Sequence, residues 1–219
     1  MQVKPLLRVV MVGITMASLA GCNTWSGDAI NTFKVAISGP ESQLTVERVN
    51  HIDAPVLLVE LGVAEALMVS PGAGTGLVEW HGQSEMLLTR GGRVIQTAGL
   101  PADMLAPLAA DDPFIQGLLS ADGREISRQV DYPALYQTGL EQHAQYRHGK
   151  VESITFMGAS HQLLRIDERI HMPELKFKAV NSYWVEPDTG LVRYSVQHIA
   201  PDLPPLRLTL VKLQGNQQP

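Results

Sequence analysis

From residue 41 onward, apolar and polar residues alternate repeatedly with a period of two, a pattern typical of half-buried β-strands. The segment 44–49 alternates in this way, and 55–61 is a short apolar run. Further segments of strand length lie at 85–89, 93–97, 125–130, 141–147, 151–157, 163–171, 182–186, 191–199 and 206–212. The chain therefore contains ten or more short strands and no regular helical crossovers.

Turn-forming residues separate these segments. Arg90-Gly91-Gly92 predicts a hairpin, and we expect turns at Gly149-Lys150, at Gly158-Ala159 and at 187–190. A sheet with this many strands must curl up or fold over to bury one face. The sequence therefore predicts a mainly β fold, with a large antiparallel sheet curled into a barrel or a sandwich.

Two short helices complete the predicted fold. In 25–37 the apolar residues recur near helical spacing, Ser26 or Asp28 can cap the first turn, and Gly39-Pro40 follows the segment. The second helix is expected inside the β domain, at 101–110.

The first 21 residues have the pattern of a signal peptide. Lys4 and Arg8 precede an apolar stretch at 9–19, which is only about half of the ~20 residues that a membrane-spanning helix needs. The stretch ends in Leu19-Ala20-Gly21-Cys22, which resembles the bacterial lipobox, in which the cysteine thiol receives diacylglycerol. The alternative is an ordinary signal peptide with an incidental cysteine.

Cys22 is the only cysteine among the 219 residues, and lipidation would leave no free thiol in an oxidising compartment. Asn23 follows it in place of the Asp that tends to retain enteric lipoproteins in the inner membrane, which favours the periplasmic face of the outer membrane. We therefore expect a signal peptide at 1–21, a lipid tether with a short helix at 22–40, and a single β domain at 41–219.

Charge and motifs exclude several classes of function. Without residues 1–21 the chain has 15 basic and 22 acidic residues, a net charge of −7, which argues against nucleic-acid binding. The glycine-rich segment 70–76 lacks the phosphate-loop pattern, and the serine in Gly158-Ala159-Ser160-His161 lacks the second glycine of a nucleophile elbow.

Neither the histidines nor the acidic pairs single out a catalytic or metal site. The seven histidines lack metal-ligand spacing, and His143 and His148 should face opposite sides of a strand. Asp111-Asp112 and Asp167-Glu168 are sequence neighbours, which on a strand point apart and in a loop are usually solvated. We therefore expect no catalytic residue, metal or cofactor. Two carboxylates from distant strands could still converge to cut a glycosidic bond, so a glycan-active enzyme stays open.

Nearly the whole chain after residue 21 resembles a known family, most specifically in its C-terminal third. The resemblance is carried by the hairpin at 86–98, by Trp80 before it, and by Asn181-Ser182-Tyr183-Trp184-Val185, Gly190-Leu191-Val192-Arg193, Gln197, Ala200-Pro201-Asp202, Pro205 and Thr209-Leu210-Val211-Lys212. These segments are similar to the YjbF/GfcB family of lipoproteins, encoded with group 4 capsule and exopolysaccharide export genes.

The resemblance implies a mostly β outer-membrane lipoprotein with a non-enzymatic accessory role in capsule or exopolysaccharide production or export. It implies as partners an outer-membrane β-barrel protein and a periplasmic export protein. If polysaccharide is bound directly, the candidate contacts are Trp80, Tyr183, Trp184 and Tyr194, although strand aromatics more often pack in the core. A carrier of a lipid or other hydrophobic ligand is the other alternative, and a deep apolar cavity would identify it.

Overall fold

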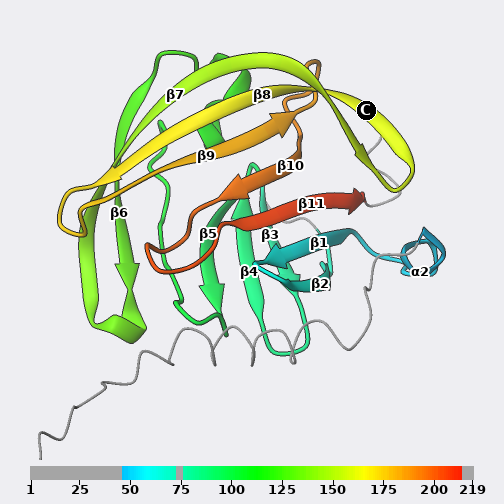
Figure 1. The fold of residues 1–219 in the computed structure, drawn as a ribbon, viewed down its shortest axis with the longest axis horizontal. Coiled ribbons are helices and arrows are strands. Elements are labelled where there is room, and N and C mark those ends of the chain that lie inside the picture. Colours follow the sequence, from blue (N-terminus) through cyan, green and yellow to red (C-terminus); the bar gives the residue numbers. More distant parts are fainter. Residues whose placement is uncertain (1–45, 73–75, 214–219) are drawn as a thin grey trace, which may run out of the picture.

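One antiparallel sheet of 11 strands dominates the computed structural model, which describes residues 46–72 and 76–213 (Figure 1). The strand order is β5-β4-β3-β2-β1-β11-β10-β9-β8-β7-β6, so every pair of adjacent strands is consecutive in sequence except β1 and β11. The strands are β1 (Val56–Leu61), β2 (Ala64–Val69), β3 (Leu77–His81), β4 (Met86–Arg90), β5 (Arg93–Ala98), β6 (Glu125–Tyr132), β7 (Gln137–Phe156), β8 (Ala159–Met172), β9 (Phe177–Val185), β10 (Val192–Gln197) and β11 (Leu206–Lys212). The helical pieces are α2 (Val46–Asn50), α3 (Pro113–Gln116), η1 (Leu118–Ser120) and η2 (Pro133–Leu135).

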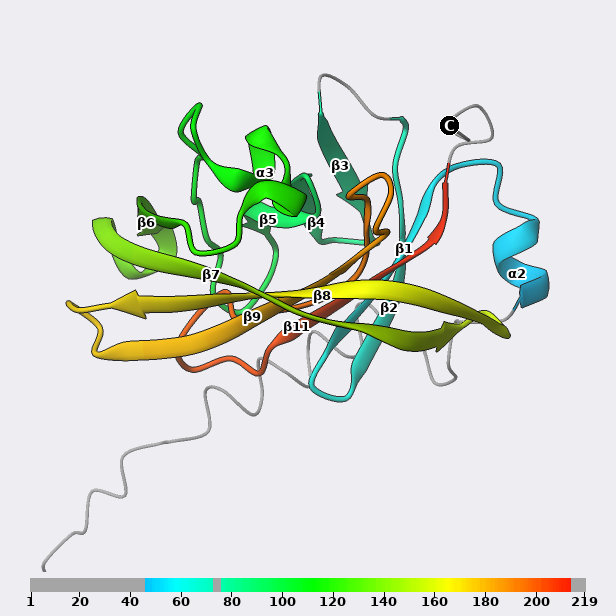
Figure 2. The ribbon, with the colours of Figure 1, turned by 90° about the horizontal axis from the view of Figure 1, so that it is seen from above.

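The sheet curls into a half-barrel around one interior. Figure 2 shows β3, β4, β5 and α3 on one side and the strands β8, β9 and β11 on the other. Buried side chains from both sides form two apolar clusters, one around β1, β2 and β11 and the other around β7, β8, β9 and Phe114. The prediction of a mainly β fold with a large curled antiparallel sheet is confirmed.

Leu105 connects the two edge strands of this sheet. Its backbone bridges Gln96 in β5 on one side and Asp131 in β6 on the other. The Leu105 and Asp131 amides each donate to the other's carbonyl, at 3.0 and 2.8 Å. The prediction of a helix at 101–110 is therefore wrong, because this segment is extended and its backbone hydrogen bonds go to the sheet edges.

The hairpin of β7 and β8 corrects a second prediction. The register passes from His148↔Ile166 to Val151↔Leu164, so one extra residue lies on β7. Gly149-Lys150 is thus a bulge within one strand of 20 residues and not a turn between two strands. The turn at Gly158-Ala159 does join β7 to β8, as predicted.

The N-terminal part of the described chain departs from the strand pattern. The alternation at 44–49 predicts a strand, but Val46–Asn50 forms one helical turn, and of Glu47, Arg48, Val49 and Asn50 only Val49 is buried. A run of only a few alternating residues is also compatible with one helical turn, because such a turn can bury a single apolar side chain. The helix predicted at 25–37 lies outside the described residues.

Candidate functional site

Two of the four candidate glycan contacts lie in the interior of the half-barrel. Trp80 is buried, and its indole N–H donates to Oγ1 of Thr89 at 2.9 Å. Tyr183 is fully buried, and its hydroxyl donates to Glu168 at 3.0 Å. Neither side chain presents a face to solvent.

The other two candidates lie together on the outer face of the sheet. The rings of Trp184 and Tyr194 have centroids 4.9 Å apart, and the guanidinium of Arg165 lies 5.4 Å from the Trp184 ring centroid. Trp184 is only 8% exposed and donates to Oε2 of Glu152 at 2.7 Å, whereas Tyr194 is half-buried. Tyr194 therefore retains the most surface for direct contact, and glycan contact by these residues stays a prediction.

A charged group fills the interior beneath β7, β8 and β9. Glu168 is 0% exposed and accepts hydrogen bonds from Nη1 of Arg93 and Nη1 of Arg128, both at 2.5 Å. It also accepts from the hydroxyl of Tyr146 at 2.8 Å and from Nδ2 of Asn181 at 2.9 Å. We call Arg93, Asp112, Arg128, Tyr146, Glu168, Asn181 and Tyr183 the buried ionic cluster.

A second carboxylate in this cluster belongs to Asp112. Its Oδ2 accepts from Nε of Arg128 at 2.6 Å, and its Oδ1 accepts from the amide of Phe114, which caps α3. Asp112 is buried, so the expectation that the pair Asp111-Asp112 is solvated is wrong for this member. The cluster thus contains two guanidinium groups and two carboxylates.

The charges of the cluster determine what Glu168 can do. Burial alone raises the pKa of Glu168, but the opposite charges of Arg93 and Arg128 and the hydrogen bonds from Asn181 and Tyr146 outweigh it. The pKa of Glu168 is consequently well below its usual range, and the side chain stays ionised. An ionised carboxylate bound to two arginines cannot serve as the proton donor that glycoside hydrolysis requires.

An apolar cavity lies elsewhere in the half-barrel, among residues of β1, β3, β10 and β11. Its volume is about 360 Å³. Its apolar lining includes Leu57, Val78, Trp80, Val192, Leu208 and Leu210. This is the feature expected of a hydrophobic-ligand carrier, although the buried ionic cluster occupies much of the neighbouring interior.

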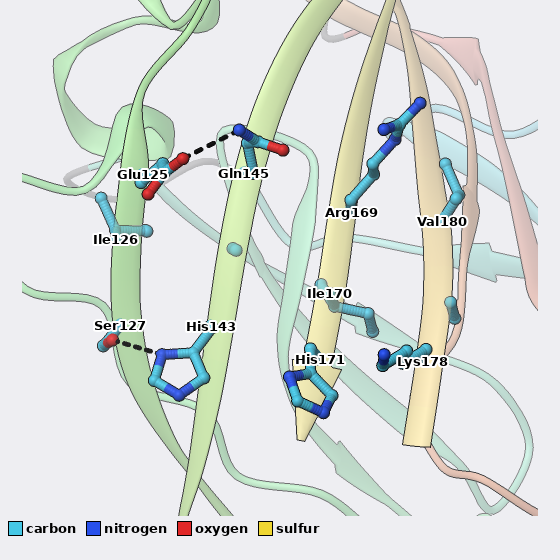
Figure 3. A pocket seen from close by; sticks show the side chains of 12 residues that line it. Glu125, Ile126, Ser127, His143, Gln145, Arg169, Ile170, His171, Lys178 and Val180 are labelled. Atoms are coloured by element: carbon cyan, nitrogen blue, oxygen red, sulfur yellow. Dashed lines mark hydrogen bonds between the residues drawn. The ribbon is translucent and has the colours of Figure 1, made fainter. Parts of the chain in front are cut away.

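A shallow groove lies on the outer face of β6, β7, β8 and β9, with a volume of about 760 Å³ (Figure 3). Two cross-strand rows of side chains line it. One row is Ser127, His143, His171 and Lys178, and the other is Glu125, Gln145, Arg169 and Val180. Between them the inward-facing Ala144 and Ile170 belong to the core, so backbone forms the floor. We call these eight residues the outer groove.

Hydrogen bonds order one side of the outer groove. Nε2 of Gln145 donates to Oε1 of Glu125 at 2.8 Å, and Oγ of Ser127 lies 3.0 Å from Nδ1 of His143. Nε2 of His143 is also 3.7 Å from Oε2 of Glu141. On the other side, no residue of the described chain forms a hydrogen bond or an ion pair with the side chain of Arg169 or Lys178.

Sequence reasoning did not identify the outer groove. Alternation places His143 with Gln145 on one face of a strand, and Arg169 with His171 on one face of another. Only the cross-strand register shows that these pairs are neighbours. Polar residues at the outward positions of several strands were visible in the sequence. Without the strand order, however, the sequence does not show which of these strands are adjacent.

His143 and His148 face opposite sides of β7, as the sequence predicts. His143 lies on the outer face, whereas Nε2 of His148 contacts the carbonyl of Leu118 at 3.1 Å, on the inner side. Within 46–72 and 76–213, no three His, Cys, Asp or Glu side chains are grouped to hold a metal ion. No helix in those residues has the length and apolar character to cross a membrane. Cys22, Leu19, Ala20 and Gly21 lie outside the described residues.

Comparison with known proteins gives one family and one shared fold. The family model described as "Group 4 capsule polysaccharide lipoprotein gfcB, YjbF" matches residues 30–211. The crystal structure of the hypothetical lipoprotein YmcC from Escherichia coli K12 superposes with a TM-score of 0.66 at 18% identity, covering 86% of this chain and 94% of that one. A lipoprotein structure from Parabacteroides distasonis has a TM-score of 0.34 at 11% identity, covering 71% and 92%, too low a score to establish a shared fold. A search of curated protein sequences finds no significant match.

Proposed function

Because this chain belongs to the YjbF family of group 4 capsule polysaccharide lipoproteins, we propose that it is a non-enzymatic accessory in capsule or exopolysaccharide production or export. The family match carries this proposal, since it extends from residue 30 into the last strand, β11. Family membership makes the chain a capsule-related lipoprotein. The location, the absence of catalysis and the partners are the further parts of the proposal.

The proposed location is the periplasmic face of the outer membrane, with lipid on Cys22 as the anchor. The lipobox sequence and Asn23 support this location. Each buried methylene of an acyl chain contributes about 0.8 kcal/mol, so the three chains of a mature bacterial lipoprotein hold the protein firmly.

The proposed mode of action is contact with other proteins. The converging carboxylates of Asp112 and Glu168 are both bound by Arg128, which supports a structural role for them. The partners we propose are an outer-membrane β-barrel protein and a periplasmic polysaccharide-export protein. Interfaces of this kind depend on a few apolar and aromatic anchors and need no catalytic group.

Deletion and complementation test the accessory role. Loss of the gene should reduce surface polysaccharide, and a wild-type copy should restore it. Alanine at each of the seven histidines, one at a time, should leave complementation nearly intact. A catalytic acid or base typically contributes about 10²–10⁴-fold in rate, so a folded, membrane-localised variant that loses all polysaccharide output through one such change would indicate an enzyme.

Copurification tests the proposed partners. The wild-type lipoprotein, crosslinked in intact cells and isolated from detergent-solubilised outer membrane, should retain a β-barrel protein of the same export system. Recovery of the lipoprotein alone under conditions that preserve other outer-membrane complexes would contradict a role in contact.

The apolar cavity favours a second function, that of a carrier for a small hydrophobic ligand. The purified protein, analysed by native mass spectrometry, would then retain a lipid. Leu208→Trp would reduce that retention by filling the cavity, while Val180→Trp on the outer face would not.

A further inference from the structure

The outer groove differs from a site for neutral sugars in what lines it. Neutral sugars commonly stack their apolar faces on Trp, Tyr or Phe, and none of these residues lines the groove. Val180 is its one apolar outward side chain. The groove therefore offers a sugar hydrogen bonds and charge but no aromatic stacking surface.

The groove also carries two cations, Arg169 and Lys178, that form no ion pair with any described residue. Arg169 and Lys178 are exposed and lie on the neighbouring strands β8 and β9. Elsewhere on the same face Arg165 is bound to Asp167 at 2.8 Å. The single carboxylate in the groove, Glu125, accepts from Gln145 on the strand between it and Arg169, and it forms no ion pair with either cation.

The other groove residues add donors of suitable type. A guanidinium carries five N–H donors and an ammonium three, and both suit carboxylate oxygens. Ser127, His143, Gln145 and His171 can bond the hydroxyl groups of a sugar. With strands 4.7–4.9 Å apart, the four-strand row spans roughly 14 Å, enough for more than one sugar unit.

The floor of the groove is held rigid from behind. Tyr146 and Glu168, which belong to the buried ionic cluster, lie on the inner faces of β7 and β8, one cross-strand pair beyond Gln145 and Arg169. A braced sheet limits the ordering cost of binding to that of the side chains, since the backbone of the groove is already fixed.

We propose that the outer groove binds a segment of an anionic, carboxylate-bearing polysaccharide, with Arg169 and Lys178 as the charged contacts. This rests on the proposed function, because the link to a capsule polysaccharide comes from the family. It adds the ligand class and a site, neither of which the family match specifies.

The test uses the full mature lipoprotein in detergent, with polygalacturonate oligosaccharides as the anionic probe and dextran oligosaccharides as the neutral one. Isothermal titration calorimetry should show binding of polygalacturonate that weakens as salt is raised, and weaker or no binding of dextran. The double substitution Arg169→Gln with Lys178→Gln should weaken polygalacturonate binding about tenfold to a hundredfold, as expected for two charge-assisted contacts.

The matched control is Arg147→Gln with Lys150→Gln, which removes the same charge from exposed positions of β7 outside the groove. The control should bind polygalacturonate like wild type, and both double variants should keep the wild-type circular dichroism spectrum. An equal loss in the control, equal binding of dextran, or no binding of polygalacturonate would each overturn the proposal. So would binding to phosphatidylglycerol vesicles through Arg169 and Lys178 without binding to polygalacturonate, which would make the groove a membrane contact.

Complementation separates this inference from the proposed function. If the groove variant loses polygalacturonate binding but restores surface polysaccharide fully, the chain is an accessory whose groove is not needed for export. If the deletion leaves surface polysaccharide unchanged, the accessory role fails, and polygalacturonate binding is judged by calorimetry alone.

Discussion

Arg93 at the start of edge strand β5 reaches across the interior to Glu168 in β8, 75 positions away in the sequence, with Nη1 2.5 Å from Oε2. The contact links the hairpin of β4 and β5 to the opposite wall of the half-barrel. Arg128, from β6 at the other edge of the sheet, binds the second oxygen of the same carboxylate. One central carboxylate thus connects both sheet edges.

Replacing this carboxylate should destabilise the fold strongly. Glu168→Gln leaves Arg93 without a counter-ion and Arg128 with only Asp112, and removing one partner of a buried ion pair typically costs about 3–5 kcal/mol. Urea denaturation should show this loss. Glu79→Gln is the control, because that carboxylate is half exposed and its change should stay within about 1 kcal/mol. A Glu168→Gln effect as small as the control would show that the cluster is not needed for stability.

The same group should make the protein sensitive to acid. Its pKa is lowered in the folded state relative to about 4.3 for an unfolded glutamate, so its stabilisation is present above that pH. The stabilisation is lost as the pH falls below about 4 towards the native pKa. Thermal melts at a series of pH values should therefore fall more steeply for wild type than for Glu168→Gln. Parallel curves would contradict the assignment.

The connection made by Leu105 can be broken at the backbone. Leu105→Pro removes the N–H that donates to Asp131 and should cost about 3 kcal/mol. Leu105→Ala keeps both backbone hydrogen bonds and removes a partly exposed side chain, so it should cost less. Hydrogen exchange at the Asp131 amide should accelerate in the proline variant and stay near wild type in the alanine variant. Equal exchange in both variants would show that this bridge does not hold the sheet edges together.

The turn between β4 and β5 packs tightly on β10. A Cβ added at Gly92 would lie 2.4 Å from Cβ of Val192, and the φ of Gly92 is +85°. Gly158 has a similar φ of +73° but open space around it. Gly158→Ala should therefore cost about 1–2 kcal/mol from the backbone alone, and Gly92→Ala about 1–3 kcal/mol more from the clash. Equal losses in urea denaturation would indicate that the turn can move away from Val192.

Lipid attachment at Cys22 is tested directly. Serine has no thiol to form the thioether, so Cys22→Ser should remain uncleaved or appear as a soluble periplasmic form. Labelling cells with radioactive palmitate should mark wild type and not the variant. Equal incorporation in both would show that the lipobox prediction is wrong.

Local sequence was sufficient for most strands and turns. A period of two and a turn such as Arg90-Gly91-Gly92 act over a few residues, and β4, β5 and β11 lie close to where the pattern predicts them. The errors occurred where tertiary contacts decided the outcome. The segment 101–110 is extended because both sheet edges need backbone partners, and Gly149-Lys150 continues β7 because β8 pairs with it on both sides of the bulge.

The sequence by itself determined the class of fold, the signal and lipobox prediction, and the family resemblance, because each depends on residues that are close in the chain or on a pattern along it. Only the tertiary structure decided that Arg93, Arg128 and Glu168 meet in the interior and that His143, His171 and Lys178 form one row outside. From the sequence alone, a charged residue in a strand is predicted to face solvent, because its partner is unknown. A charged side chain can be buried only when an opposite charge lies next to it. Here the opposite charge comes from a distant strand, and the order and register of the strands decide which charges become neighbours.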